Sequence, residues 1–213
     1  MDRTQHWESQ YTTREETSVG WFEAVPAASL RRIREAVDAG ARSLIDIGGG
    51  ASRLVDHVLE IGLDRVAVLD ISAHGLAIAK ERLGSRAAGV EWIVGDVTAL
   101  EDVGHYDIWH DRAVFHFLIE SRDRARYVEL AERSLTPGGF AVMATFAPDG
   151  PERCSGLPCR RYAPLALAAE CGPGFELLDS EGYVHTTPGG VEQRFAYSTF
   201  RRSSRERQLV NAR

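Results

Sequence analysis

The sequence has no long apolar run, few cysteines and no excess of positive charge. Among its 213 residues there is no uninterrupted apolar stretch of the roughly 18 residues that a membrane-spanning helix needs. The first residues are polar and lack the apolar core of a secretory signal, so we expect a cytoplasmic protein. The formal net charge of −6 argues against a nucleic-acid partner, because backbone-binding proteins are basic.

Cysteine usage is consistent with this location. The cysteines are odd in number, lack CxxC spacing and lie at Cys154, Cys159 and Cys171. We therefore expect reduced thiols rather than a disulfide framework. A zinc site would need a fourth ligand and closer spacing, so no metal is predicted. The one basic cluster, at 201–207, is interpreted as part of a solvated tail.

From about residue 26 the sequence alternates between helical and strand patterns. Helical spacing of apolar residues predicts helices near 26–39, 54–61, 72–83 and 124–135. Short apolar runs predict strands at 43–47, 66–69, 91–94, 106–109 and 140–146. Such alternation predicts a mostly parallel sheet with helices on both faces. The β-rich runs 175–185 and 194–200 have no helix between them and should form an antiparallel hairpin.

Glycines and a carboxylate follow the first two predicted strands. Residues 48–50 are all glycine, so a ligand could approach the backbone there, next to a helix N-terminus that favours anionic groups. Asp70 ends the next strand and could accept hydrogen bonds from both ribose hydroxyls of an adenosine. The structural alternatives are a tight turn without a ligand and a carboxylate that caps the helix beginning after Ser72.

The same two features would suit a dinucleotide, so the alternatives have to be separated. A Gly-x-Gly-x-x-Gly/Ala fingerprint would need a small residue where Arg53 stands. Asp46 precedes the glycines and would repel a pyrophosphate, whereas it suits the ammonium of a methionine tail. A nicotinamide-dependent oxidoreductase is therefore the less favoured interpretation, and a binding module without turnover is a third.

With these motifs the sequence resembles the class I S-adenosylmethionine-dependent methyltransferases. The matching segments are Asp46-Ile47-Gly48-Gly49-Gly50, Asp70-Ile71-Ser72, Gly95-Asp96-Val97 and Leu135-Thr136-Pro137-Gly138-Gly139. The resemblance implies a methyltransferase enzyme that uses S-adenosyl-L-methionine, with Gly48 and Gly50 next to the cofactor. It also implies that Asp70 holds the ribose, that Asp96 and the Val97 amide bind adenine, and that Ile71 packs on the adenine face.

Its fold would be α/β, with a Rossmann-like, doubly wound, seven-stranded sheet that is mostly parallel and ends in an antiparallel hairpin. We expect one domain, with an N-terminal lid segment at 1–25, a core at 26–202 and a tail at 203–213. Ser52 stands where many relatives have a third glycine.

Further segments are similar to the branch that contains the lysine methyltransferases of citrate synthase and elongation factor 1A. These segments are His6-Trp7, Tyr11, Trp21-Phe22 and Asp111-Arg112. The similarity adds Trp7, Tyr11, Trp21, Asp111 and Arg112 to the expected cofactor contacts. Independently of the family, aromatic faces can cover an adenine and attract a sulfonium, and an arginine can clamp a carboxylate. A hydrophobic staple for the N-terminus and an internal ion pair of Arg112 are the structural alternatives.

The methyl acceptor is less well defined. His110 ends the fourth predicted strand and is the candidate base, although methyl transfer from a sulfonium needs a base only when the acceptor arrives protonated. The segment 147–162 should meet the acceptor, with Cys154 and Arg160 as the predicted substrate contacts. Together with Arg153 and Arg161 they could recognise an anionic acceptor, and the structural alternative is a solvated, irregular cap. We predict a small-molecule acceptor, with a protein lysine as the alternative and no nucleic-acid or membrane partner.

Overall fold

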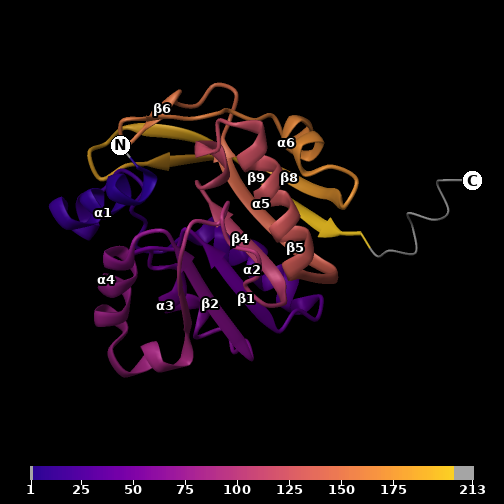
Figure 1. The fold of residues 1–213 in the computed structure, drawn as a ribbon, viewed down its shortest axis with the longest axis horizontal. Coiled ribbons are helices and arrows are strands. Elements are labelled where there is room, and N and C mark those ends of the chain that lie inside the picture. Colours follow the sequence, from indigo (N-terminus) through magenta and orange to yellow (C-terminus); the bar gives the residue numbers. More distant parts are fainter. Residues whose placement is uncertain (1, 204–213) are drawn as a thin grey trace, which may run out of the picture.

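The computed structural model describes residues 2–203 and shows a central sheet with helices on both sides (Figure 1). Most of the expected tail, including residues 204–207 of the basic cluster, lies outside the described residues. The helices are α1 Arg3–Thr13, α2 Ala27–Asp38, α3 Leu54–Val58, α4 Ala73–Leu83, α5 Ser121–Ser134 and α6 Pro164–Cys171, with 3-10 turns η1 Glu16–Ser18, η2 Gly84–Gly89 and η3 Phe115–Phe117. The strands are β1 Ser43–Ile47, β2 Arg65–Asp70, β3 Glu91–Val94, β4 Tyr106–Arg112, β5 Leu135–Phe146, β6 Arg153–Cys154, β7 Leu157–Pro158, β8 Phe175–Thr186 and β9 Glu192–Arg202.

The main sheet has seven strands in the order β3-β2-β1-β4-β5-β9-β8. The strands β1 to β5 are parallel, whereas β9 runs antiparallel to both β5 and β8. The predicted fold class is therefore confirmed, including the closing hairpin. A separate two-stranded hairpin of β6 and β7 lies within the segment that was predicted to meet the acceptor.

Side-chain alternation divides the core into two layers. In β1, Ile45 and Ile47 pack with residues of α5 and α6 on one face of the sheet. Leu44 faces the other way and packs with α2, α3 and α4. Successive residues of a strand point to opposite faces, so the odd and even positions of each strand serve different layers. The same alternation determines which polar residues of the strands can reach a ligand at the strand ends.

The N-terminal segment contains a helix that the sequence did not predict. Helix α1 lies beside α4 (Figure 1) and buries Tyr11. Its other anchors are charged. Glu8 accepts a hydrogen bond from the Ala73 amide at 2.7 Å, at the N-terminus of α4, where the helix dipole favours a carboxylate. Arg3 pairs with Asp123 of α5. Helix α1 is only weakly amphipathic, so its residues show no clear helical pattern. The contacts that hold it in place are polar and join residues far apart in the sequence.

Other boundaries follow local chemistry. Ser72 caps α4 by accepting a hydrogen bond from the Gly75 amide at 3.0 Å, as expected for an N-cap serine. Strand β5 begins at Leu135, before the Thr-Pro-Gly-Gly turn, and its register with β4 shifts between Tyr106 and Ile108. Helix α6 was not predicted, and begins with a proline in its first turn.

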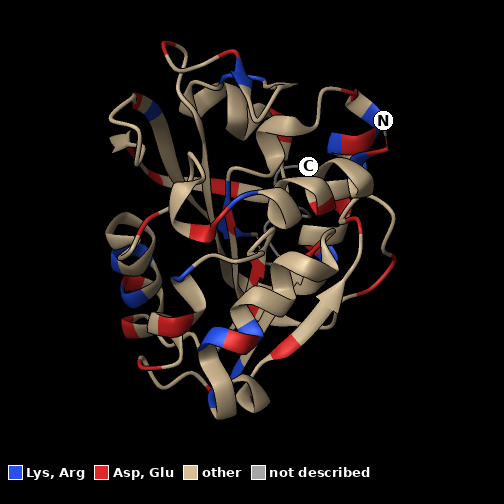
Figure 2. Ribbon diagram, turned by 90° about the vertical axis from the view of Figure 1, so that its left-hand side faces the viewer, with Lys and Arg blue, Asp and Glu red and all other residues tan. Residues whose placement is uncertain are grey.

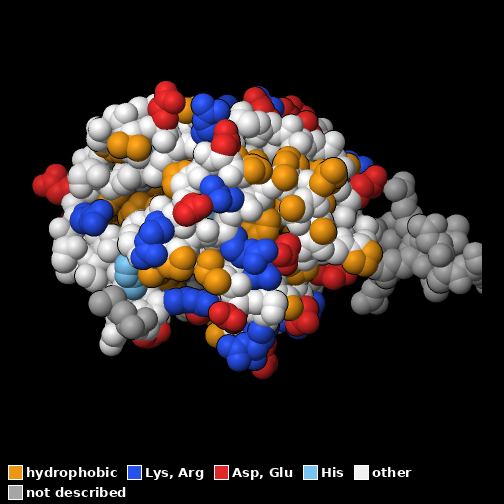
Figure 3. Space-filling model, turned by 90° about the horizontal axis from the view of Figure 1, so that it is seen from above, with side chains coloured by type: hydrophobic (Ala, Val, Ile, Leu, Met, Phe, Trp, Pro, Cys, Tyr) orange, Lys and Arg blue, Asp and Glu red, His pale blue; other side chains and the backbone are white. Residues whose placement is uncertain are grey.

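Charges are distributed over the surface without a single dominant sign. Acidic and basic residues are interspersed along the elements seen in Figure 2. On the face shown in Figure 3, both signs lie among apolar side chains. Within residues 2–203, none of the helices has the length and hydropathy needed to cross a bilayer.

Candidate cofactor and acceptor site

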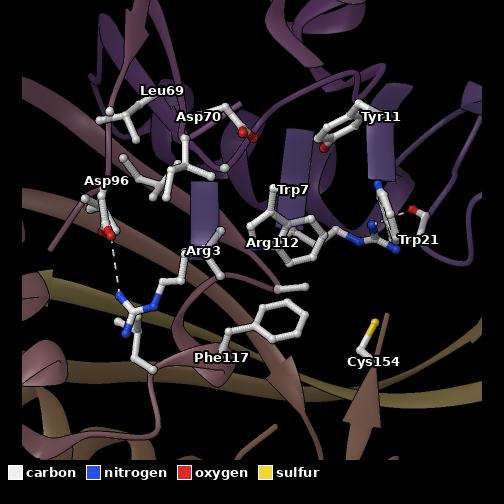
Figure 4. A pocket seen from close by; sticks show the side chains of 18 residues that line it. Arg3, Trp7, Tyr11, Trp21, Leu69, Asp70, Asp96, Arg112, Phe117 and Cys154 are labelled. Carbon is white, nitrogen blue, oxygen red and sulfur yellow. Dashed lines mark hydrogen bonds and ion pairs between the residues drawn. The ribbon is translucent and has the colours of Figure 1, made fainter. Parts of the chain in front are cut away.

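A cavity opens at the carboxyl ends of the parallel strands, where open α/β sheets usually bind ligands (Figure 4). It lies where α1, the Gly-rich turn after β1 and the segment after β4 meet. The residues that line it are Arg3, Trp7, Tyr11, Trp21, Ile47, Gly48, Leu69, Asp70, Ile71, Gly95, Asp96, Val97, Arg112, Ala113, Val114, Phe117, Leu118 and Cys154.

The turn after β1 is packed too closely for any side chain. A β-carbon on Gly50 would lie 2.1 Å from the Tyr11 hydroxyl and 2.9 Å from Asp70 Oδ2. A β-carbon on Gly48 would lie 2.1 Å from Val114 Cγ2. Both glycines have positive φ, at 44° and 68°, which L side chains rarely adopt. The run of glycines therefore serves both the backbone conformation and the close approach of neighbouring residues.

Asp70 is a buried carboxylate at the end of β2. Its side chain accepts a hydrogen bond from the Ser72 amide at 2.7 Å. Burial raises the pKa of Asp70 to about 7, and the acidic neighbours Asp46 and Glu8 act in the same direction. An anion in these surroundings would be stabilised by additional hydrogen-bond donors.

Asp96 follows β3 and lies on the same side of the cavity as Asp70 (Figure 4). One of its oxygens accepts hydrogen bonds from the Thr98 amide at 2.8 Å and the Thr98 hydroxyl at 2.7 Å. The other oxygen lies 3.4 Å from Arg3 Nη1. Asp96 therefore joins the wall of the cavity to helix α1.

Arg112 ends β4 and fixes the segment that carries Trp21. Its Nη1 donates to the Trp21 carbonyl oxygen at 2.8 Å, and its Nη2 lies 3.1 Å from Glu23. Glu23 also contacts His185 Nδ1 at 3.1 Å and accepts a hydrogen bond from the Tyr183 hydroxyl at 3.1 Å. Burial opposes ionisation of Glu23, but the bond with His185 and the charge of Arg112 lower its pKa overall. The Nε atom of Arg112 is buried and has no partner among the described residues.

At the wall opposite the carboxylates, the ring of Trp7 contacts two other aromatic rings (Figure 4). The Trp7 ring lies 5.8 Å from the Trp21 ring and 5.1 Å from the Phe117 ring, each in an edge-to-face arrangement. Tyr11 lies 6.1 Å from Trp21 and extends the cluster to the glycine turn. The aromatic residues of the N-terminal segment are therefore brought to the predicted site, although they also stabilise each other.

Asp46 and His110 do not line the cavity. They are opposite each other in the pairing of β1 with β4, and both face α2. His110 Nδ1 lies 2.6 Å from Asp46 Oδ1, and His110 Nε2 lies 2.9 Å from the Ser29 hydroxyl. Both ring nitrogens are thus engaged in a buried network below the glycine turn. The structure does not place His110 where a catalytic base would have to be, nor Asp46 where it would meet a ligand ammonium.

Asp111 also lies away from the cavity, on the opposite face of β4. Its carboxylate accepts hydrogen bonds from the amides of Val114 at 2.8 Å and Phe115 at 3.0 Å, and from the Tyr127 hydroxyl at 2.6 Å. Burial raises the pKa of Asp111 to about 6 despite these donors. Asp111 therefore holds the turn that presents Val114 and Phe117 to the cavity, rather than touching a ligand itself.

Of the two predicted acceptor contacts, one lines the cavity and the other does not. Cys154, in β6, lines the cavity, and burial raises the pKa of its thiol. Arg160 does not line it, because its side chain donates to the Tyr162 hydroxyl at 3.0 Å and pairs with Glu170 at 3.2 Å. The arginines 153 and 161 are likewise bonded to residues of their own segment. The expected recognition of an anionic acceptor by these arginines is therefore not supported.

Several lining residues were not predicted from the sequence. Arg3 reaches the cavity only because α1 forms and docks. Phe117 reaches it through the η3 turn that Asp111 anchors. Ala113 has a φ of 72°, uncommon for a residue other than glycine, in the turn that leads from β4 to these residues. None of these features leaves a periodic pattern that a single sequence would reveal.

Comparisons with known proteins agree with this geometry. Residues 45–143 match the family model described as a methyltransferase domain. The chain has the fold of the N-methyltransferase NodS from Bradyrhizobium japonicum WM9, solved with S-adenosyl-L-homocysteine. That likeness has a TM-score of 0.72 at 13% identity and covers 95% of this chain and 100% of the other.

Residues 45–143 are therefore similar to a methyltransferase domain, and the described chain has the fold of solved S-adenosylmethionine-dependent methyltransferases. A second solved structure is the 1,6-didemethyltoxoflavin-N1-methyltransferase of Burkholderia thailandensis, with a TM-score of 0.66 at 21% identity over 85% of this chain and 80% of the other. A curated relative, the ribosomal protein L11 methyltransferase of Geotalea uraniireducens, is 31% identical over 103 residues. That match covers 48% of this chain, which spans only 30% of the relative's length.

The residues that line the cavity fit S-adenosyl-L-methionine. Among the three glycines of the turn, Gly48 lines the cavity, so a ligand can contact its backbone, whereas the predicted contact Gly50 is covered by Tyr11 and does not line it. The carboxylate of Asp70 is buried among acidic neighbours, and ribose hydroxyls are donors that would stabilise it. Arg112 lines the other end of the cavity, and its buried Nε has no hydrogen-bond partner among the described residues.

Binding of S-adenosylhomocysteine should depend on pH through Asp70. Only the ionised carboxylate is a strong acceptor, and its pKa is about 7. We expect affinity to rise about tenfold between pH 6 and pH 8 by linkage. Asp70→Asn should bind about 1–3 kcal/mol more weakly at pH 8 and show little pH dependence in this range. Titration calorimetry at several pH values measures both effects, and equal pH dependence of the two proteins would contradict the assignment.

The same substitution should stabilise the ligand-free protein. Because burial raises the pKa of Asp70 in the fold, the wild type loses stability as pH rises from about 4 through about 7. Asn carries no such charge, so Asp70→Asn should be more stable than the wild type at pH 8, by about 2–4 kcal/mol at most. Chemical denaturation should show this advantage shrinking toward pH 4, and a less stable variant at pH 8 would argue against the raised pKa.

Tyr127→Phe should destabilise the turn that Asp111 anchors. The Tyr127 hydroxyl accepts from Trp109 Nε1 at 2.8 Å and donates to Asp111, and all three groups are buried. Its loss leaves an indole N–H unpaired and should cost about 2–4 kcal/mol. Tyr106→Phe is the control, because that hydroxyl only contacts Glu91 at 3.3 Å and should cost about 1 kcal/mol or less. Similar losses in denaturant titrations of the two variants would be evidence against this role.

Proposed function

We propose that this chain transfers the methyl group of S-adenosyl-L-methionine to a small-molecule acceptor held inside the cavity. The observation that carries the proposal is that the cavity is bounded both by the N-terminal segment and by the distant β6–β7 hairpin. Trp7 and Tyr11 come from α1, Trp21 follows η1, and Cys154 comes from the β6–β7 hairpin. A folded protein substrate would have to displace α1 to reach the reacting methyl group, whereas a metabolite needs a much smaller opening.

In this proposal the cosubstrate lies along the strand ends. Asp70 accepts from the ribose hydroxyls, and Asp96 and the Val97 amide hold the adenine, with Ile71 against its face. The glycine turn passes next to the methionine portion. Arg112 donates its free Nε to the carboxylate of that portion, which would satisfy a buried nitrogen that has no partner among the described residues.

The chemistry that bound S-adenosylmethionine supplies is an activated methyl group on a sulfonium. The chain's own contribution is then to align the acceptor with that group and to exclude water. The faces of Trp7, Trp21 and Phe117 would attract the sulfonium charge, as aromatic rings attract an ammonium. His110 has no part in this proposal, because its ring nitrogens are bonded to Asp46 and Ser29.

The relatives support both kinds of acceptor. The toxoflavin methyltransferase was solved with bound 1,6-didemethyltoxoflavin, a small molecule, whereas the curated relative is named for a ribosomal protein. The match to the latter covers less than half of this chain, and α1 and the β6–β7 hairpin that bound the cavity lie outside the methyltransferase family match. The enclosure of the cavity therefore favours a small molecule.

The acceptor can be identified with labelled S-adenosylmethionine and an extract of the source cells that has been separated by size. We expect label in the small-molecule fraction, because the site is enclosed by α1. Asp70→Asn, assayed at pH 8 and at a limiting concentration of the methyl donor, serves as the control for cofactor-dependent transfer. Label confined to a protein band would replace this proposal by the protein-methyltransferase alternative.

Residues 1–25 should act as a lid that closes on the cosubstrate. Trypsin can cut after the exposed Arg14 at the end of α1, and S-adenosylhomocysteine should slow this cut by ordering the aromatic cluster. Cleavage after Arg86, which does not line the cavity, should slow less. Glu8→Gln weakens the charge interaction with α4 and should speed the Arg14 cut. Equal protection at both sites would show global stabilisation and no lid.

A further inference from the structure

The cavity has two chemically different ends (Figure 4). Asp70 and Asp96 lie at one end, which the proposed function gives to the adenosine. We define the acceptor end as Trp7, Trp21, Phe117 and Cys154, which line the opposite side of the cavity. Its surface consists of three aromatic rings and one thiol, so it is flat-walled, apolar and polarizable. An acceptor held there would bury a planar apolar group.

No described residue at the acceptor end can act as a general base. The ionisable groups that line the cavity near this end are the Arg112 guanidinium, the Cys154 thiol and the Tyr11 phenol. Burial raises the pKa of both Cys154 and Tyr11, so both stay protonated at neutral pH, and Tyr11 is held against the glycine turn. A general base has to reach the proton that it removes, and these groups carry no free lone pair of suitable basicity.

The nearby histidines are not placed to act as a general base either. His116 is fully buried, and burial lowers its pKa to about 3. Its Nδ1 faces the Phe146 amide at 3.3 Å. His6 packs edge-on against Trp7 at 5.4 Å, but it does not line the cavity. Glu23 lies behind Arg112 and does not line it either.

The absence of a base restricts the acceptor. An alcohol or an alkylammonium must lose a proton before or during attack, and nothing at this end receives it. An alkylammonium would also be repelled by the charge of the sulfonium, and no described carboxylate lines the acceptor end. A thiol differs, because its pKa lies near 8.5 or lower, so a useful fraction is already thiolate in neutral solution.

From the apolar, base-free acceptor end we propose that this methyltransferase acts on an aromatic thiol and methylates its sulfur. The inference rests on the proposed function and specifies its substrate class. The acceptor enters as the thiolate, having lost its proton to solvent. A sulfur–carbon bond forms between the thiolate and the methyl group, the bond from the sulfonium sulfur to that carbon breaks, and its electron pair stays on the departing sulfur. The ring of the acceptor packs between Phe117 and Trp21, with the neutral Cys154 thiol beside it.

The test uses three probes of similar size, thiophenol, phenol and benzylamine, with the full-length chain and S-adenosylmethionine. Products are quantified by mass spectrometry after subtraction of the rate without protein. We expect kcat/KM for thiophenol to exceed those of the other two by at least 100-fold. The rate should rise with pH as the thiol of the acceptor ionises and should be constant above the pKa of that thiol. His6→Gln should leave the rate unchanged, because no protein base is used.

Phe117→Ala tests the acceptor end itself. It should lower kcat/KM for thiophenol at least tenfold while changing the affinity for S-adenosylhomocysteine less than threefold. Phenol or benzylamine turning over within tenfold of thiophenol, or a rate that depends on His6, would overturn the inference. So would a chain that binds S-adenosylhomocysteine but methylates none of the probes. A different result contradicts the proposed function itself, namely label that appears only on protein in the extract experiment.

Discussion

The glycine turn after β1 is so crowded that none of its three residues could carry a β-carbon without a clash. Val114 approaches Gly48, Asp46 and Val68 approach Gly49, and Tyr11 approaches Gly50. These neighbours come from the turn after β4, from β1 and β2, and from the N-terminal helix, so the elements of the site meet at the glycine turn. The same crowding leaves Asp70 buried next to the backbone, which raises its pKa and prepares it for hydroxyl donors.

Alternation along the strands decides the roles of the polar residues near this turn. Asp46 and His110 lie side by side on β1 and β4 and face α2, where they bond to each other and to Ser29. Asp111 is the next residue after His110, so it faces α5 and meets Tyr127. Neighbouring residues of β4 therefore have different roles: His110 lies in the buried network against α2, whereas Asp111 supports the turn that carries Phe117.

Helix α1 connects the two sides of the cavity through charges of opposite sign. Arg3 reaches Asp96 and Asp123, whereas Glu8 caps the N-terminus of α4. Contacts of this kind are weaker than a buried apolar interface and are reversible, which suits a segment that must admit a cosubstrate. The aromatic residues that α1 carries then supply the apolar wall of the acceptor end.

The sequence by itself determined the sheet, the glycine turn and the carboxylates at the strand ends, because these depend on local periodicity and on motifs of adjacent residues. The strands at 43–47 and 91–94 match β1 and β3, and the Ser72 cap forms as expected. The Asp70 and Asp96 positions follow from the same rule, since parallel strands end at one edge. The tertiary structure alone decided which side chains face the cavity, because strand register and helix docking are set by residues far apart in sequence. It turned His110 and Asp46 toward α2, engaged Arg160 with Glu170, and brought Arg3 and Phe117 to the site.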